Sequence, residues 1–191
     1  MLVEVMSDRQ SVVKSESSQQ VRLVAMCALV LLAILARFIP HPPNFSPVGA
    51  VALFSGAFLT QRWFALLIPI AILTISDAFI GFHSLVPVVY GCFLINVLIG
   101  RWVGGHSNPL VLAGATLAGS IQFFLITNLA NWWAYYPHTR EGFLENYILA
   151  IPYFQNSVMS DLLFTTVLFG GWHFAVSVVA GWNNSRQTTE V

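Results

Sequence analysis

The chain has 191 residues, of which 57% are hydrophobic and only 8% are charged. A soluble domain needs a polar surface that such a composition cannot provide, so the sequence predicts an integral membrane protein that has the lipid bilayer as its surroundings. Eight basic and eight acidic residues give a formal net charge of zero. Without a basic excess we expect no nucleic-acid partner.

The first segments of the chain differ sharply in polarity. Residues 1–20 are rich in Ser, Gln and charged side chains, and they are too polar to bury much surface, so we predict a disordered cytoplasmic tail. Residues 21–39 form an apolar stretch of about 19 residues, which at about 1.5 Å per residue matches the bilayer core. No clear cleavage site follows this stretch, which favours a retained first helix.

Five further apolar stretches follow, separated by Pro, Gly, Asn or charged residues. They are residues 47–59, 63–80, 85–99, 110–133 and 156–180. The second and fourth of the six stretches are short for a full crossing, and a five-span alternative would make one of them re-entrant. We therefore predict an all-α polytopic protein with a six-transmembrane-helix bundle over residues 21–182 and a short cytoplasmic tail at residues 183–191.

The basic residues predict the orientation of these spans. With the N-terminus inside, six basic residues are cytoplasmic and two are external, which satisfies the positive-inside rule. The cytoplasmic set is Arg9, Lys14, Arg22, Arg62, Arg101 and Arg186, and the external set is Arg37 and Arg140. Both termini are then expected in the cytoplasm.

Polar side chains within three of the spans fall near one side of the predicted membrane. Asn96 and Gln122 are exceptions to this layer. A polar group in hydrocarbon is costly unless it is paired, so a layer of them predicts a place that holds something. The layer consists of Asp77 in the third span, Asn128 and Asn131 in the fifth, and Asn156 and Asp161 in the sixth.

The predicted external connections are aromatic and rich in proline. They cover residues 40–45, 81–83 and 131–140, and they contain Asn44 and His83. Aromatic faces with a few polar groups suit a small organic ligand. The alternative for the Trp and Tyr residues is an interfacial aromatic belt.

Two carboxylates stand out within the polar layer. Asp161 lies near the predicted N-terminal end of its helix, where the helix dipole favours a negative charge, whereas Asp77 lies near a C-terminal end, where the dipole opposes it. Asp77 is therefore expected to need a cation, a proton or hydrogen-bond donors. Arg37, at the outer end of the first span, is the natural counter-charge. A static salt bridge between them is the structural alternative to a ligand-binding role.

Two other groups of polar residues each allow two interpretations. Asn128 and Asn131 are three residues apart and share a helix face, so they either join helices or contact a ligand. His41, His83 and His138 lie on three external loops and could in principle bind a metal. Their spacing is not that of a metal site, so we predict no metal and no cofactor.

Five local sequences are familiar in combination. They are RFIPHPPNFSPVG at residues 37–49, SDAFIGFH at 76–83, YGCF at 90–93, TN at 127–128 and YPHT at 136–139. From about residue 37 to residue 170 the chain resembles an uncharacterised family of small bacterial membrane proteins. That family is similar to the substrate-binding S components of energy-coupling factor transporters.

The resemblance implies a function and a set of partners. S components are six-helix proteins of the bacterial cytoplasmic membrane that capture vitamins or similar micronutrients at the external face. They deliver the substrate within a complex that contains a transmembrane coupling protein and two cytoplasmic ATPases. This chain lacks a P-loop and would bind no ATP itself. The candidate substrate-binding residues are Arg37, Asn44, Asp77, His83, Tyr90, Asn128, Asn131 and Asp161.

Two other functions stay open at this point. The chain could be an intramembrane enzyme with Asp77 and Asp161 as acid and base, or a scaffold that organises other membrane proteins. We favour the substrate-binding function and therefore predict no catalytic residue. Aromatic loops and neutral amides suit a heterocyclic compound better than a bare ion.

Overall fold

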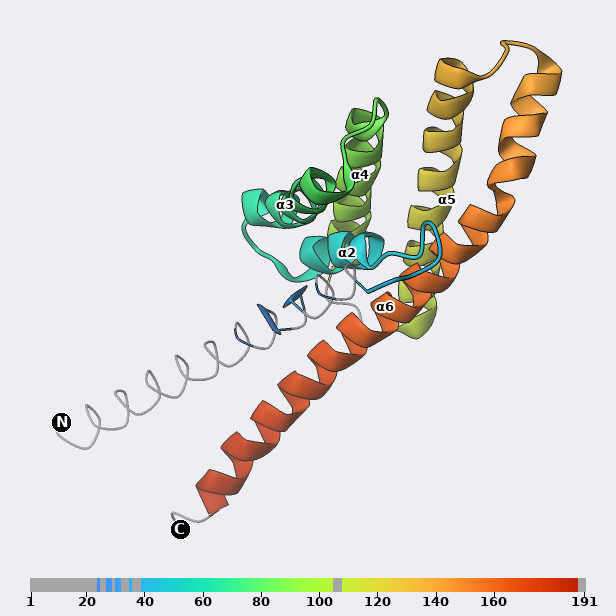
Figure 1. Cartoon of the computed structure of the whole chain (residues 1–191). Helices are drawn as coiled ribbons and strands as arrows, with labels where there is room; N and C mark the ends of the chain where they lie inside the picture. The colour runs from blue at the N-terminus through green and yellow to red at the C-terminus, as the bar shows by residue number, and fades with distance from the viewer. Residues whose placement is uncertain are drawn as a thin grey trace.

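The computed structural model describes residues 24, 27, 28, 30, 31, 35, 39–104 and 108–188. Residues 1–20 and Arg37 lie outside this part of the chain. The described residues between 24 and 35 are helical, and the rest form five further helices without a strand among them (Figure 1). These helices are α2 (Val48–Phe58), α3 (Arg62–Ile80), α4 (Val86–Val103), α5 (Pro109–Tyr135) and α6 (Arg140–Thr188).

Four of the helices are long and apolar enough to cross a membrane. The qualifying segments are Arg62–Phe79, Val86–Val103, Pro109–Tyr135 and Arg140–Val178. Large apolar side chains cover their outer surfaces: Trp63 is 76% exposed, Trp102 is 79% exposed and Phe174 is 70% exposed. Such side chains belong against lipid. The predicted all-α membrane protein is confirmed, whereas a count of six crossings is not.

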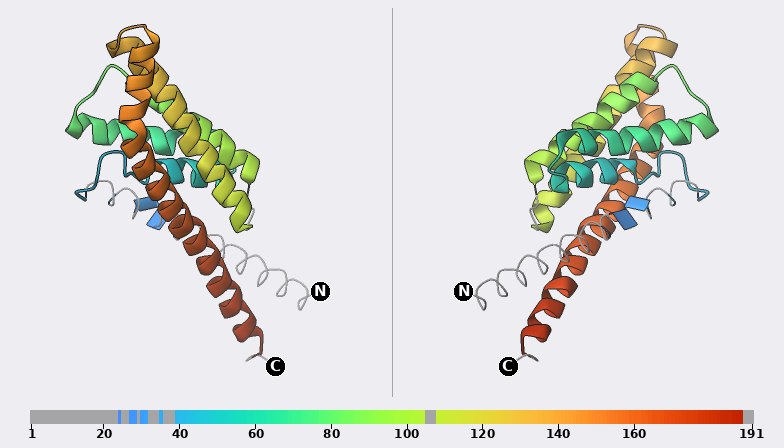
Figure 2. Two further views of the ribbon diagram at one scale, coloured as in Figure 1. Left: turned by 90° about the vertical axis from the view of Figure 1, so that its right-hand side faces the viewer. Right: turned by 90° about the vertical axis from the view of Figure 1, so that its left-hand side faces the viewer.

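Helix α2 is the reason why the count differs. Its bounds agree with the predicted stretch 47–59 to within one residue, but its 11 residues span only about 16 Å, against about 30 Å of hydrocarbon. Residues 48–56 are all buried, because α3, α4, α5 and α6 all pack against this helix. Both α2 and α3 run across the directions of α4 and α5 (Figures 1 and 2). Helix α2 is therefore a central element of the bundle and not a full crossing.

The backbones of α2 and α4 touch at two glycines. A Cβ atom added to Gly56 would overlap the carbonyl group of Val97, and one added to Gly100 would overlap the carbonyl group of Leu53. Small residues at a helix crossing allow this close approach, which maximises van der Waals contact where lipid offers no hydrophobic driving force. The two glycines thus fix α2 in position against α4.

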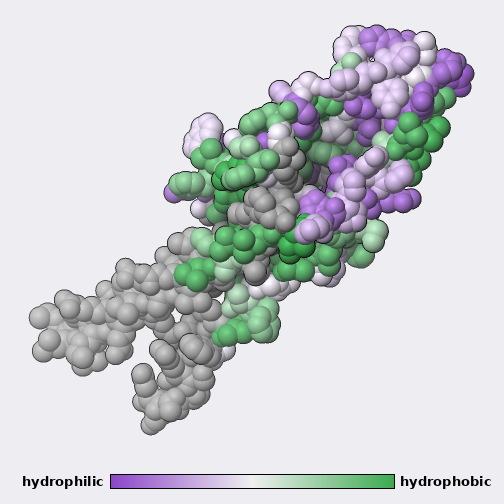
Figure 3. Space-filling view, viewed as in Figure 1, coloured by the Kyte–Doolittle hydropathy of each residue, from purple (hydrophilic) through white to green (hydrophobic). Residues whose placement is uncertain are grey.

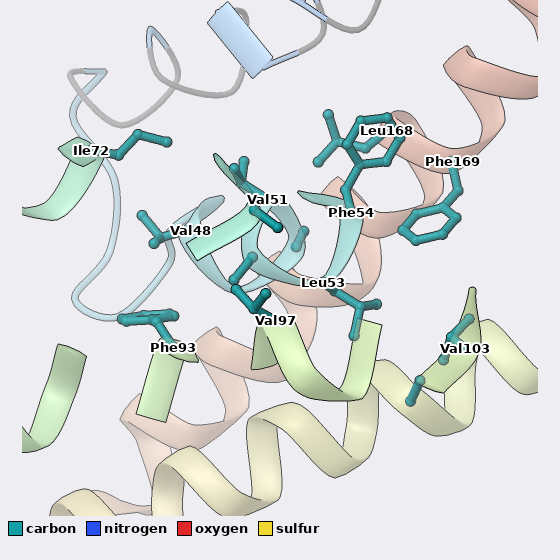
Figure 4. Close-up of a cluster of buried hydrophobic side chains, with 14 of the residues drawn as sticks. Val48, Val51, Leu53, Phe54, Ile72, Phe93, Val97, Val103, Leu168 and Phe169 are labelled. Carbon is teal, nitrogen blue, oxygen red and sulfur yellow. The ribbon is translucent and has the colours of Figure 1, made fainter. Parts of the chain in front are cut away.

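An aromatic cluster joins α2 to α6. Phe54 is fully buried, and its ring centroid lies 4.8 Å from that of Phe58, 5.4 Å from that of Phe169 and 6.3 Å from that of Trp172. Figure 4 shows Phe54 beside Leu168 and Phe169 of α6. These tilted and edge-on ring arrangements are the favourable ones. Helix α2 is therefore held on one side by backbone contact and on another by rings.

Helix α6 is much longer than predicted. It has 49 residues, and the predicted span 156–180 is only part of it. The preceding part is helical because α5 provides partners for its polar groups: the Asn146 amide donates to the Asn128 carbonyl oxygen at 2.8 Å, and the Tyr147 hydroxyl donates to the Leu125 carbonyl oxygen at 2.8 Å. Figure 3 shows hydrophilic residues gathered over the tip where α5 leads into α6. At its other end α6 continues to Thr188, into the predicted tail 183–191.

Asn146 provides a test of this α5–α6 pairing. It is 2% exposed, and its side-chain oxygen also accepts a hydrogen bond from the Asn131 amide at 2.7 Å. Asn146→Ala leaves buried groups on Asn128 and Asn131 without this partner, so we expect a loss of about 1–3 kcal/mol in the free energy of unfolding. The measurement is SDS-induced unfolding in mixed micelles. Gln155→Ala, at an exposed position of α6, should change stability by less than about 0.5 kcal/mol; equal losses in the two variants would contradict the pairing.

Candidate ligand-binding cavity

A cavity of about 470 Å³ lies where five helices converge. Its wall combines the beginnings of α2 and α4, the ends of α3 and α5, and the middle of α6. This volume falls within the range of about 300–1,000 Å³ that is typical of small-molecule sites. The wall contains both apolar rings and polar side chains, so it can offer a ligand contact area and a defined orientation.

Most of the predicted site residues meet at this cavity. Tyr90 is not in the wall, but its hydroxyl donates to Asp77 Oδ2 at 3.0 Å. Arg37 lies outside the described residues, so its pairing with Asp77 stays a prediction. The part that any of these residues plays in binding a substrate is likewise a prediction. The six that line the cavity are Asn44, Asp77, His83, Asn128, Asn131 and Asp161.

Asp77 lies near the C-terminal end of α3, as predicted. Its side chain is 8% exposed. The Gly81 amide donates to the Asp77 carbonyl oxygen at 2.7 Å and ends the helix with a φ of 111°, a conformation that requires glycine. The Tyr90 hydrogen bond ties the carboxylate to α4. The end of α3 therefore presents Asp77 to the cavity in a fixed position.

Asp161 does not lie near the start of its helix, because α6 begins at Arg140. The prediction that its own helix dipole stabilises the carboxylate is therefore wrong. The Ser120 hydroxyl of α5 instead donates to Asp161 Oδ2 at 2.7 Å. A Cβ atom on Gly49 would overlap Asp161 Oδ1, so the carboxylate lies against the first turn of α2. The partial positive charge at that helix N-terminus takes the place of the expected dipole.

The asparagine pair on α5 contacts protein groups as well as the cavity. The Asn128 amide donates to the Phe124 carbonyl oxygen of its own helix at 2.8 Å, and the Asn131 amide donates to Asn146 across to α6 at 2.7 Å. Asn131 therefore joins two helices, which was one of its two predicted roles. Asn96, an exception to the predicted layer, also lines the cavity, and its side-chain oxygen accepts a hydrogen bond from the Gln122 amide at 3.0 Å.

The aromatic rings of the wall come from helices and not from the external connections. The rings of Phe93 and Phe123 lie 5.2 Å apart, and those of Phe124 and Phe154 lie 4.6 Å apart. By contrast, Trp133 of the predicted aromatic connection is 67% exposed, as an interfacial belt requires. Phe124 and Asn128 are four residues apart and therefore share one face of α5. This spacing is the sequence signal that could have placed the Phe124 ring beside the predicted polar residue.

The three histidines of the possible metal site do not converge. His41 and His83 line the cavity. His138 instead stacks on Trp133 with ring centroids 4.6 Å apart, and its Nε2 lies 2.9 Å from the Trp133 carbonyl oxygen. In the described part of the chain no three His, Cys, Asp or Glu residues are grouped to hold a metal ion.

Comparison with known proteins assigns a family without a function. The model of a family of unknown function, DUF6580, matches residues 17–183. No curated protein and no solved structure matches the chain. The matched region contains every described element of the cavity wall. Because the match covers most of its length, the chain belongs to the DUF6580 family of unknown function.

Proposed function

We propose that this protein is a membrane-embedded substrate-binding subunit for the uptake of a small, vitamin-like micronutrient. The observation that carries the proposal is the cavity of about 470 Å³ where five helices converge, with polar groups from α3, α5 and α6 in its wall. A bundle held together only by packing has no need to keep two carboxylates at such a cavity, because each one is costly in a membrane. A bound ligand explains both the space and the polar groups.

The basic residues support an outward-facing cavity. Arg62 begins α3, and Arg101 of α4 donates to the carbonyl oxygens of Leu59 and Thr60 at 3.4 and 3.3 Å. Asp77 lies near the other end of α3. Under the positive-inside rule the arginine end is cytoplasmic. The cavity then opens to the exterior of the bacterial cytoplasmic membrane.

The likeness to S components extends this proposal to partners. The predicted first helix at residues 21–39 and the helices α2–α6 together make six helices, the number that S components have. The partners would then be a transmembrane coupling protein and two cytoplasmic ATPases. S components commonly meet the coupling protein through an Ala-xxx-Ala patch on the first helix, whereas here Ala25 is followed by Leu29 and Ala28 by Leu32. A coupling protein would therefore have to recognise a different surface.

The proposal is tested by ligand retention. The protein is purified from its own host, and the small molecules released on denaturation are identified by mass spectrometry. Ala150 lines the cavity and is 8% exposed, so Ala150→Phe should fill part of the space and lower the amount of released compound at least about tenfold. Ala71→Phe places the same ring at an exposed position of α3 and should release as much as the wild type.

The outcomes separate binding from a purely structural cavity. A compound that is enriched with the wild type and Ala71→Phe but lost with Ala150→Phe supports the proposal. A wild-type protein that releases no enriched compound, and whose thermal stability no vitamin changes, would overturn it. Circular dichroism and gel filtration establish that Ala150→Phe is folded before its loss of ligand is interpreted.

A further inference from the structure

The cavity wall contains a buried acidic group, Asp161. It is 9% exposed, and no Lys or Arg side chain lines the part of the cavity wall that the structure describes. Within a membrane the surroundings weaken electrostatic interactions much less than water does. The Asp161 carboxylate is therefore a strong determinant of which ligands the cavity accepts.

The Asp161 carboxylate has one hydrogen-bond donor and one helix terminus beside it. The Ser120 hydroxyl donates to it at 2.7 Å, and the first turn of α2 lies against it at Gly49. A helix N-terminus corresponds to about half of an elementary positive charge, which offsets only part of a full negative charge. At a position that is only 9% exposed, a full positive charge on a ligand would therefore stabilise the ionised carboxylate further. A neutral or anionic ligand over this carboxylate would remove water from it without replacing that water by a positive group.

The rings around the cavity favour the same kind of ligand. Phe93 and Phe123 form one pair and Phe124 and Phe154 form another, and all four line the cavity. The face of an aromatic ring attracts cations, and aromatic walls are a common means of recognising ammonium groups. The rings and Asp161 are independent features of the sequence, and both suit a ligand with a positive charge.

The size of the cavity suits an organic molecule better than a bare metal ion. A volume of about 470 Å³ is that of an organic molecule. Among the described residues there is also no group of three acidic, His or Cys side chains to coordinate a metal. An organic group that carries the positive charge fits these two observations.

We propose that the cavity selects a small organic cation, such as a protonated amine or a charged nitrogen heterocycle, whose charge pairs with Asp161 while its apolar part packs on the phenylalanine rings. This inference rests on the proposed ligand-binding function and adds the chemical class of the ligand. It predicts a preference among probes of one shape and different charge.

Benzylammonium, benzyl alcohol and benzoate provide such probes, because they share a ring and differ in charge at pH 7. Their affinities are measured by ligand-observed NMR on the wild-type protein in nanodiscs. We expect benzylammonium to bind at least about tenfold more tightly than either of the others, the difference that an added ion pair of moderate strength produces. Asp161→Asn should reduce this preference to less than twofold. Glu145→Gln, the same change at an exposed position of α6, should retain it.

The result distinguishes this inference from the proposed function. Equal affinities of the wild-type protein for the three probes, or a preference for benzoate, would overturn the cation inference. This comparison needs only the wild type, so it holds even if Asp161→Asn does not fold. Such a result leaves the proposed function intact. If no probe binds, the charge of the compound released from purified protein decides: a cation supports the inference, and a neutral or anionic compound overturns it. A protein that binds no probe and releases nothing overturns both.

Discussion

Gly100→Ala is expected to prevent assembly of the bundle or to lower the free energy of unfolding by about 3 kcal/mol, the upper end of the usual cost of overpacking. The added methyl group would overlap the Leu53 carbonyl group of α2, and a backbone carbonyl in a helix cannot rotate away as a side chain can. Helices α2 and α4 would have to separate, and α2 has neighbours on its other sides. Yield of monodisperse protein and SDS-induced unfolding in mixed micelles measure the effect.

Gly91 supplies a matched control on the same helix. A Cβ atom at Gly91 would have no heavy atom within 4 Å. Because glycine is a poor helix former, Gly91→Ala should leave the stability unchanged or raise it by up to about 1 kcal/mol. If Gly100→Ala were as stable as Gly91→Ala, then α2 and α4 would not pack at the close distance described above.

Phe54→Ala is expected to cost about 3 kcal/mol, which is the low end of the range for buried phenylalanine in soluble proteins. The expected loss is at the low end of this range because the apolar groups of an unfolded membrane protein remain in lipid and are not transferred to water. The loss therefore comes mainly from the packing contacts that the ring makes in the folded protein. Phe54 contacts rings of α2 and α6 and is fully buried. The same unfolding assay measures the change.

Phe174→Ala is the comparison for this prediction. Phe174 lies on α6 as well, but it is 70% exposed on the surface that faces lipid. Its removal leaves no internal cavity, so the loss should stay below about 1 kcal/mol. Similar losses for the two variants would show that the aromatic cluster between α2 and α6 does not hold the bundle together.

The helix positions were the most predictable part of this fold. The bounds of α3 differ by a single residue from the apolar stretch 63–80, and α5 begins and ends within two residues of 110–133. A chain in lipid must satisfy its backbone groups within each segment, so an apolar run bounded by Gly, Pro or charge is a helix. The meeting of Asp77, Asn128 and Asp161 at one cavity agrees with the predicted polar layer, in which all three lie near the same side of the membrane.

Features that depend on contacts between helices were missed. The length of α2 does not distinguish a central element from a short crossing until its neighbours are known. The early start of α6 depends on Asn146 finding partners on α5. The true neighbour of Asp161 is Gly49, more than a hundred residues away in the chain. Hydropathy along the sequence contains no information about such pairs.

The two ends of α2 contact different parts of the protein. Gly49 at its start lies against Asp161 in the cavity wall, and Gly56 near its end lies against the α4 backbone. A ligand that holds Asp161 in place therefore also restricts α2, and through α2 it restricts α4. Binding free energy adds to folding free energy when the ligand binds only the folded state. The melting temperature of the intact protein is thus a direct gauge of whether the cavity is occupied.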